Sequence, residues 1–376
     1  MIRRIAYVVR TFPRLSQTFV TRELDWLLAN GFECRIFCLN RSDEAVTQAA
    51  ARSPWILARL HHLDQASEAI LAGFSPDIIH AHFATDAALA ALDLGHRHRV
   101  PVTFTAHGYD IYRDPPEDFA RRAERAAFVV TVSEANRRHL VERLGVRREK
   151  IKLVPNGIDT DFFAPDPGQP KPGISHIVCV ARLEPVKQLH LLLAGCGVLR
   201  DADVPFRCTI VGEGSCRDTL LTLRQELGLT DHVTFAGPLE SERVRHHLRS
   251  AHLAVLSSQS EGHPVSLLEA AAVGIPAVAP AVGGIPEIIV HGETGLMTDS
   301  ADPRALGMAM ARVCTDHVLA GSMGTAARQR ALRHFSTDRQ LGALVEVWEA
   351  ARRAWDSGGP EAACDPIEDR RERGTG

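Results

Sequence analysis

Residues 257–297 read SSQSEGHPVSLLEAAAVGIPAVAPAVGGIPEIIVHGETGLM. The apolar run 252–256 that leads into them has the length of a buried strand. Pro264 suits the first position of a helix, and the apolar spacing after it is helical. Gly274 followed by Pro276 predicts the end of that helix. The stretch therefore predicts a strand, a tight loop, a helix and a second strand.

Two glutamates, Glu261 and Glu269, lie in this stretch. On one helix they would be about 80° apart. If Glu261 lies on the loop instead, both carboxylates can line one pocket at the start of the helix. Free N–H groups at a helix N-terminus bind phosphate, Gly262 allows a ligand close to the backbone, and a carboxylate can accept hydrogen bonds from a sugar diol. The alternative is a surface loop with two solvated glutamates.

The rest of the chain alternates short apolar runs with helical patterns, which predicts α/β architecture with parallel, doubly wound sheets. Its 376 residues suggest two domains. The segment 164–173 is rich in Pro, Gly and Asp and is the expected linker. We expect domains over 1–164 and 165–335, a last helix over 336–355 and a disordered tail over 356–376.

Composition restricts the class of protein. A net charge of −3 argues against nucleic-acid binding, and no apolar segment reaches the roughly 20 residues that cross a bilayer. The eight cysteines are scattered without a CxxC motif, which predicts reduced, buried thiols rather than zinc ligands. We expect a cytoplasmic protein, since no signal peptide precedes Ile2.

Ligands of doubly wound sheets lie beyond the carboxyl ends of the strands. In the first half, the loop TAHGYD (105–110) places His107 and Asp110 there, and the loop HAHFATD (80–86) places His80 and His82, of which we expect at least one to be structural. In the second half, VARLEPVKQL (180–189) carries Arg182 and Lys187. These cations can hold a diphosphate, Arg through a forked pair of bonds and Lys as a point charge, or they can be ordinary surface residues.

These motifs, in this order, resemble the retaining, GT-B-fold glycosyltransferases of family 4, which have an Arg-x4-Lys pair, a Glu-x7-Glu pair and a Gly-Gly turn. The resemblance covers residues 1–350 and implies two Rossmann-like domains facing a cleft, with the last helix crossing back to the first domain. It implies catalytic or charge-stabilising roles for His107, Arg182, Lys187 and Glu261. It implies donor-binding roles for Gly212, Gly214, Leu239, Gly262, His263, Pro264, Val265 and Glu269, and no metal or other cofactor.

The segment FPRLSQTF (12–19) resembles the opening of bacterial glycosyltransferases that build exopolysaccharides such as colanic acid. It implies acceptor contacts for Ser16, Gln17, Thr18 and, on the neighbouring loop, Asp110. The expected partners are a nucleotide-sugar donor and a saccharide or lipid-linked oligosaccharide acceptor. The basic region 121–152 is either a solvated helix face or a contact with the inner face of the plasma membrane.

The sequence thus predicts a retaining hexosyltransferase that moves a sugar from a nucleotide diphosphate to a saccharide hydroxyl in cell-surface glycan assembly. No side chain is a convincing nucleophile or general base, so the leaving phosphate itself would take the acceptor's proton, as the resemblance implies. Two alternatives remain, a nucleotide-sugar epimerase of the same fold and a non-catalytic sugar-binding protein. The base, the sugar and the acceptor stay open.

Overall fold

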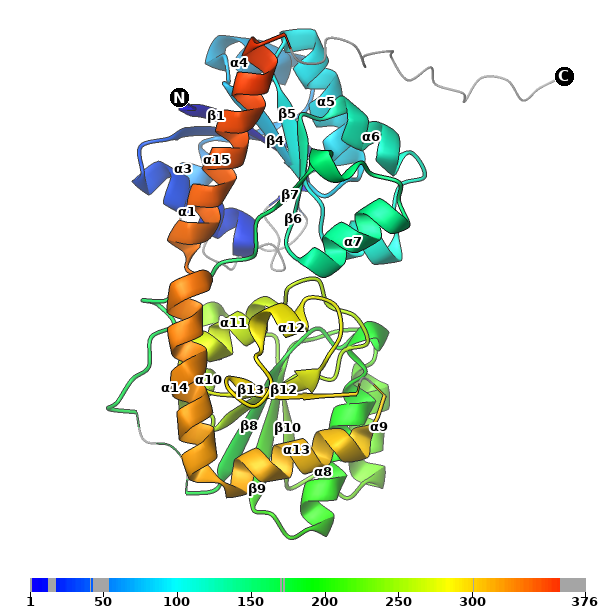
Figure 1. Ribbon diagram of the computed structural model, residues 1–376, viewed down its shortest axis with the longest axis vertical. Coiled ribbons are helices and arrows are strands. Elements are labelled where there is room, and N and C mark those ends of the chain that lie inside the picture. The colour runs from blue at the N-terminus through cyan, green and yellow to red at the C-terminus, as the bar shows by residue number, and fades with distance from the viewer. Residues whose placement is uncertain are drawn as a thin grey trace, which may run out of the picture. The chain divides into compact units, whose positions relative to one another are not determined.

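The computed structural model describes residues 2–12, 18–40, 42, 54–169, 171, 173–299 and 301–358. The chain forms two compact units (Figure 1). The first comprises Met1–Thr131, His139–Lys152 and Leu344–Gly376, and the second comprises Val132–Arg138 and Leu153–Ala343. The chain therefore returns to the first unit near its end, as expected of a helix that crosses back.

The first unit contains a seven-stranded sheet of order β3-β2-β1-β4-β5-β6-β7. The pairings from β3 through β6 are parallel. The strands are β1 (Arg4–Thr11), β2 (Glu33–Asn40), β3 (Leu60–His62), β4 (Ile78–His82), β5 (Val102–Thr105), β6 (Phe128–Thr131) and β7 (Ile151–Leu153).

Helices connect these strands (Figure 1). They are α1 (Thr18–Ala29), α3 (Pro54–Leu57), α4 (Gln65–Phe74), α5 (Asp86–His98), α6 (Phe119–Arg125) and α7 (Glu134–Glu142), with a π-helical turn η1 at Tyr109–Arg113 and a 3-10 turn η2 at Arg148–Lys150. An apolar core of Ala, Val, Ile, Leu and Phe side chains joins α5 to the sheet, because alternate residues of each strand face that helix.

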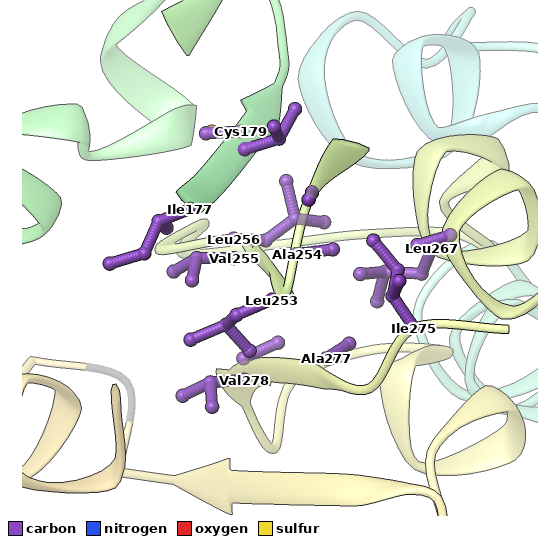
Figure 2. Packing of buried hydrophobic residues seen from close by; sticks show 14 of the residues in the cluster. Ile177, Cys179, Leu253, Ala254, Val255, Leu256, Leu267, Ile275, Ala277 and Val278 are labelled. Carbon is purple, nitrogen blue, oxygen red and sulfur yellow. The ribbon is translucent and has the colours of Figure 1, made fainter. Parts of the chain in front are cut away.

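The second unit contains a six-stranded, fully parallel sheet of order β10-β9-β8-β11-β12-β13. Its strands are β8 (Ser175–Val180), β9 (Phe206–Val211), β10 (Val233–Gly237), β11 (Leu253–Val255), β12 (Ala277–Pro280) and β13 (Gly295–Thr298). Leu253 and Val255 of β11 pack with Ile177 of β8 and Val278 of β12 in one apolar core (Figure 2).

The helices of this unit lie on both faces of its sheet (Figure 1). They are α8 (Leu189–Asp201), α9 (Arg217–Glu226), α10 (Ser241–Ser250), α11 (Val265–Ala272), α12 (Ile285–Ile288), α13 (Pro303–Thr315), α14 (His317–His334) and the start of α15 (Thr337–Asp356), with a 3-10 turn η3 at Pro185–Lys187. Helices α8 and α13 pack on each other, as do α11 and α14. Helix α15 belongs to the first unit from Leu344 onward.

The predicted α/β architecture and two parallel sheets are confirmed. Two local predictions are wrong. Pro264 caps helix α11 rather than opening it, because the first helical residue is Val265. The helical pattern of the sequence over 323–334 predicts a helix that starts at Met323. The structure begins that helix, α14, six residues earlier at His317, because the Asp316 side chain accepts a hydrogen bond from the Leu319 N–H and caps it.

Burial corrects the description of the basic region 121–152 as one solvated face. Arg122 is buried and donates to the carbonyl oxygens of Ala84 and Thr85, both at 2.8 Å. Lys150 is also buried and donates to two carbonyl oxygens of the α6 end, at 2.8 and 2.7 Å. These two cations are therefore satisfied inside the first unit and are not available to a membrane.

Six of the seven cysteines in the described part of the chain are buried, and the seven are free thiols, as predicted. Within the same residues no helix is long and apolar enough to cross a membrane. The predicted disordered tail falls from residue 359 onward outside the described residues.

Candidate functional site

The predicted donor residues of the second unit gather at one edge of its sheet. Parallel strands end at the same edge, and five of the six strands are followed directly by a predicted site segment or its glycine turn. Arg182 and Lys187 follow β8, Gly212 and Gly214 follow β9, Leu239 follows β10, Ser257–Val265 follows β11, and Gly283–Gly284 follows β12.

An ion pair joins two of these segments. The Lys187 Nζ donates to Oε1 of Glu261 at 2.5 Å, and the side chains are 16 % and 8 % exposed. The Ser258 hydroxyl donates to the same oxygen at 2.6 Å. A nearly buried carboxylate is stable only when its charge is compensated, and here an ammonium and a hydroxyl do so.

Backbone contacts fix the same two loops to each other. The Ser257 hydroxyl donates to the Lys187 carbonyl oxygen at 2.9 Å, and the Gln259 N–H donates to the Val186 carbonyl oxygen at 2.8 Å. The 3-10 turn that carries Lys187 then ends at Gln188, whose φ of +44° is unusual for a residue with a side chain. The ion pair therefore rests on loops that are held at several points.

Arg182 is exposed, and its segment runs beside the glycines of the next strand end. Gly212 has a φ of +141°, and a Cβ there would lie 2.0 Å from the Ala181 carbonyl oxygen. A Cβ on Gly214 would lie 2.5 Å from the carbonyl oxygen of Leu183. Both glycines are thus required by the close approach of the Arg182 segment.

A similar close approach holds the Glu261 loop. The Gly284 N–H donates to the Glu261 carbonyl oxygen at 3.0 Å. Gly283 has a φ of +53°, and a Cβ there would lie 1.8 Å from that same oxygen. A Cβ on Gly284 would lie 1.9 Å from the Gly262 carbonyl oxygen. The Gly-Gly turn therefore fixes the position of the loop that carries the Glu261 carboxylate.

His263 and Pro264 complete the entry into helix α11. His263 is buried, and burial followed by the Arg330 charge lowers the pKa of its imidazole to about 3. Neither ring nitrogen has a hydrogen-bond partner within the described residues, whereas its carbonyl oxygen accepts from the Asn156 amide at 2.9 Å. The neutral ring packs against Phe335, with centroids 5.4 Å apart.

Val265 and Glu269 lie on helix α11, one turn apart, and Glu261 lies on the preceding loop. The structure thus has the loop arrangement of the two glutamates rather than the single-helix arrangement. Glu269 is partly buried, and so is Leu239, which packs against the core of the unit.

His107 and Asp110 lie in the first unit, after β5. Asp110 is fully buried and accepts backbone N–H bonds from Ala84 at 2.6 Å and His107 at 2.8 Å. Burial raises the pKa of Asp110 to about 7, against the effect of these bonds. In this arrangement its carboxylate ties the β4–α5 loop to the His107 loop, and the predicted acceptor contact stays a prediction.

The predicted acceptor residues near the N-terminus cannot be placed. Ser16 and Gln17 lie outside the described residues, and for Thr18 only the backbone, at the start of α1, is described. Within the described residues there is no group of three or more His, Cys, Asp or Glu side chains that could hold a metal ion.

Sequence reasoning missed Glu23 and left His82 undecided. The Glu23 carboxylate, on α1, lies 3.0 Å from His82 Nε2. His80 is enclosed by Thr103, Thr105 and the indole of Trp348. The alternation His-x-His on one strand was the available signal, since it places both rings on one face of the sheet.

Family models match both units. The model described as Glycosyltransferase Family 4 matches residues 16–162, and that described as Glycosyl transferases group 1 matches residues 167–330. The chain is 30% identical over 317 residues to the D-inositol 3-phosphate glycosyltransferase of Nocardia farcinica, covering 76% of this chain and 68% of that protein. This chain belongs to the family 4 glycosyltransferases.

Further similarity extends over almost the whole chain. A protein of Escherichia coli K12 named for colanic acid biosynthesis, the glycosyltransferase WcaL, is 28% identical over 370 residues, covering 82% of this chain and 90% of that protein. Among solved structures, Anabaena HepE in complex with UDP and glucose superposes with a TM-score of 0.78 at 16% identity, over 93% of this chain and all of that chain. The sucrose-phosphate synthase of Thermosynechococcus elongatus gives a TM-score of 0.74 at 19% identity, over 94% and 100%. The chain is therefore a glycosyltransferase of the GT-B fold.

Proposed function

We propose that this glycosyltransferase moves a hexose from a nucleotide-diphosphate sugar to a saccharide hydroxyl, with retention of the anomeric configuration and without a metal. The observation that carries the proposal is the Lys187–Glu261 ion pair at the carboxyl ends of β8 and β11. It joins a cation suited to a leaving diphosphate with a carboxylate suited to sugar hydroxyls, on two loops that are locked together.

Each part of the donor has its own set of residues in this proposal. Arg182 and Lys187 neutralise the charge that grows on the leaving diphosphate. Glu269 holds the ribose diol, and Glu261 with the backbone of 262–265 holds the transferred sugar. The Gly212–Gly214 loop and Leu239 flank the base, and His107 contacts the sugar from the first unit.

The similarities support the proposed donor and the proposed class of product. WcaL is named for colanic acid biosynthesis, and HepE was solved with UDP and glucose, which supports a nucleotide-sugar donor and a cell-surface polysaccharide as product. We propose a saccharide or lipid-linked oligosaccharide acceptor, contacted by Ser16, Gln17, Thr18 and Asp110. Work on a lipid-linked acceptor would place the protein at the inner face of the plasma membrane.

The first experiment is a thermal-unfolding panel with UDP, GDP, ADP and dTDP. A nucleotide present at about 100 times its dissociation constant adds roughly 2.7 kcal/mol to the free energy of unfolding, which is readily measured. We expect one nucleotide to stabilise the wild-type protein. If the folded protein responds to none of them, the donor site is wrong.

Lys187→Met tests the ion pair, and Arg304→Met is its control, because Arg304 is an exposed cation of the same unit on helix α13. We expect Lys187→Met to lose the additional thermal shift that a nucleotide sugar gives over the free nucleotide, and to lower transfer by at least about tenfold, as the loss of a charge-assisted bond predicts. Arg304→Met should keep both. Equal behaviour of the two variants would refute the role of Lys187. Nuclear magnetic resonance of the fresh product then decides between retention and inversion.

A further inference from the structure

One face of the sheet in the first unit carries a connected set of polar side chains. His80 and His82 alternate on β4 and therefore point to the same side, and Tyr7 of β1 is in register with His80. The Tyr7 ring stacks on the His82 ring, with centroids 5.7 Å apart. The opposite side of the same strands is apolar and packs against α5.

Three side chains at this face, those of Glu23, His82 and His107, form a chain of hydrogen bonds, and the Tyr7 hydroxyl joins the chain at Glu23. The Tyr7 hydroxyl donates to Oε2 of Glu23 at 3.3 Å. His82 Nε2 lies 3.0 Å from that same oxygen, and His82 Nδ1 lies 3.2 Å from Nε2 of His107. The chain thus starts at a buried carboxylate on helix α1 and ends at the histidine after β5.

The carboxylate determines the direction of these bonds. An ionised carboxylate only accepts, so the hydrogen that it receives from His82 is on Nε2. In a neutral His82 the other nitrogen, Nδ1, then has a lone pair and accepts from Nε2–H of His107. Burial and the neighbouring His82 lower the pKa of His107 well below its usual value, so His107 is neutral. Its remaining nitrogen, Nδ1, has the lone pair.

Carboxylate–histidine pairs of this kind orient an imidazole and select its tautomer, both beside metals and in hydrolase triads. Here the imidazole at the end of the chain, that of His107, also lies beside aromatic rings. The rings of Phe83 and Phe19 lie with centroids 4.5 and 4.9 Å from that of His107. His107 Nδ1 has no hydrogen bond to any described residue, and its side chain is only partly buried.

The backbone beside His107 is strained. Phe83 has a φ of +70°, a conformation that costs about 1–2 kcal/mol for a residue with a side chain. Its N–H donates to the Thr105 carbonyl oxygen at 2.8 Å, which holds it beside the His107 loop. Strain of this kind gathers at functional sites, whereas a purely structural histidine cluster does not require it.

We propose that Glu23 and His82 are positioning residues of the transferase, which hold His107 in its Nε2–H tautomer so that its Nδ1 accepts a hydrogen bond from a substrate hydroxyl. The inference rests on the proposed contact between His107 and the sugar. It adds two residues that need not touch the substrate: Glu23, which sequence reasoning missed, and His82, whose role it left undecided.

Two substitutions at His82 separate its two bonds. In His82→Asn the amide can replace Nδ1 and still accept from His107, and in His82→Gln the longer amide replaces Nε2 and reaches only Glu23. We expect His82→Gln to lower kcat/KM on the order of 10- to 100-fold, as for other supporting residues of active sites. His82→Asn should retain several-fold more activity than His82→Gln.

The tautomer gives a readout that a merely structural role would not change. In protein labelled with ¹⁵N-histidine, His107 is assigned from the signal lost in His107→Ala. We expect the wild type and His82→Asn to show the Nε2–H form, and His82→Gln to show a mixture. An Nδ1–H form in the wild type would overturn the proposal, whether or not the variants fold.

The outcomes also separate this inference from the proposed function. If His107→Ala leaves transfer unchanged in folded protein, the sugar contact of His107 is wrong. If His107→Ala abolishes transfer while His82→Gln keeps both the wild-type rate and the wild-type tautomer, only the positioning role is wrong. A loss in both, with the tautomer changed in His82→Gln, supports the proposal.

Discussion

Gly283→Ala tests whether the Gly-Gly turn sets the position of the Glu261 loop. Gly283 has a φ of +53°, and a Cβ there would lie 1.8 Å from the Glu261 carbonyl oxygen. Gly292 is the matched control. Its φ is +82°, so alanine is equally disfavoured by the backbone, but a Cβ there would meet nothing within 4 Å.

The expected magnitudes follow from these two environments. The positive φ alone costs roughly 1–2 kcal/mol for alanine at either position. At Gly283 the loop must also open by about 1.2 Å to bring the new methyl to the 3.0 Å limit of real contacts. Forced displacement in a packed site costs about 1–3 kcal/mol more. A shift of about 1 Å in a group that positions substrate lowers catalysis on the order of 100-fold.

Denaturant unfolding and donor-dependent transfer measure the two consequences separately. We expect Gly292→Ala to lose only the backbone share of stability and to keep wild-type kcat/KM. Gly283→Ala should be less stable than Gly292→Ala and should lose most of its transfer. If the two variants have the same free energy of unfolding within about 0.5 kcal/mol and the same kcat/KM, the proposed clash at Gly283 is refuted. The cost of a positive φ would then explain both variants by itself.

Three further substitutions test the first unit. Trp348→Phe removes the indole N–H that lies 3.3 Å from His80 Nδ1 and should cost about 1 kcal/mol in urea unfolding. Asp110→Asn leaves one of two backbone N–H groups facing an amide donor and should cost about 1–3 kcal/mol. Burial raises the pKa of Asp110 to about 7, above its value in the unfolded chain, so the wild type loses stability as the pH rises toward 7. Asparagine does not titrate, and the stability lost in Asp110→Asn relative to the wild type should therefore be larger in acid than in base. Unfolding measured at several pH values checks this. Gly95→Ala places a Cβ 2.2 Å from Val102 Cγ2 and should lower the melting temperature by several degrees, as about 1–3 kcal/mol of overpacking predicts.

Much of the fold was predictable, because it depends on local patterns of the sequence. Apolar runs of strand length alternate with helical spacing, and Gly274, with a φ of +79°, ends helix α11 as its residue type predicts. Ser133 directly follows an apolar strand pattern, a place where serine is typical of a helix cap, and it caps helix α7 by accepting a 3.1 Å bond from the Asn136 N–H. Short strand β3 is not predictable from the sequence, because its three residues are all partly buried and show no alternation.

The site was predictable only in part. Motifs placed Lys187 and Glu261 at the ends of their strands, since strand ends are local features. They could not show that the two side chains pair, because that depends on the register between β8 and β11. Glu23 carries even less signal. Its place beside His82 follows from how helix α1 packs on the sheet, 59 residues away in sequence.

The internal pairing of Lys187 has a consequence for how an anionic donor would bind. Because Glu261 already neutralises the ammonium, this pair contributes little long-range attraction to a diphosphate. Arg182 is exposed at the same edge of the sheet, so its charge is the one that an approaching anion meets first. In the binding mode that we propose, Lys187 would strengthen its contact with the diphosphate only as Glu261 turned toward the sugar. Binding of the diphosphate and binding of the sugar are then coupled through the Lys187–Glu261 ion pair. A free nucleotide, which lacks the sugar, should bind without breaking this ion pair.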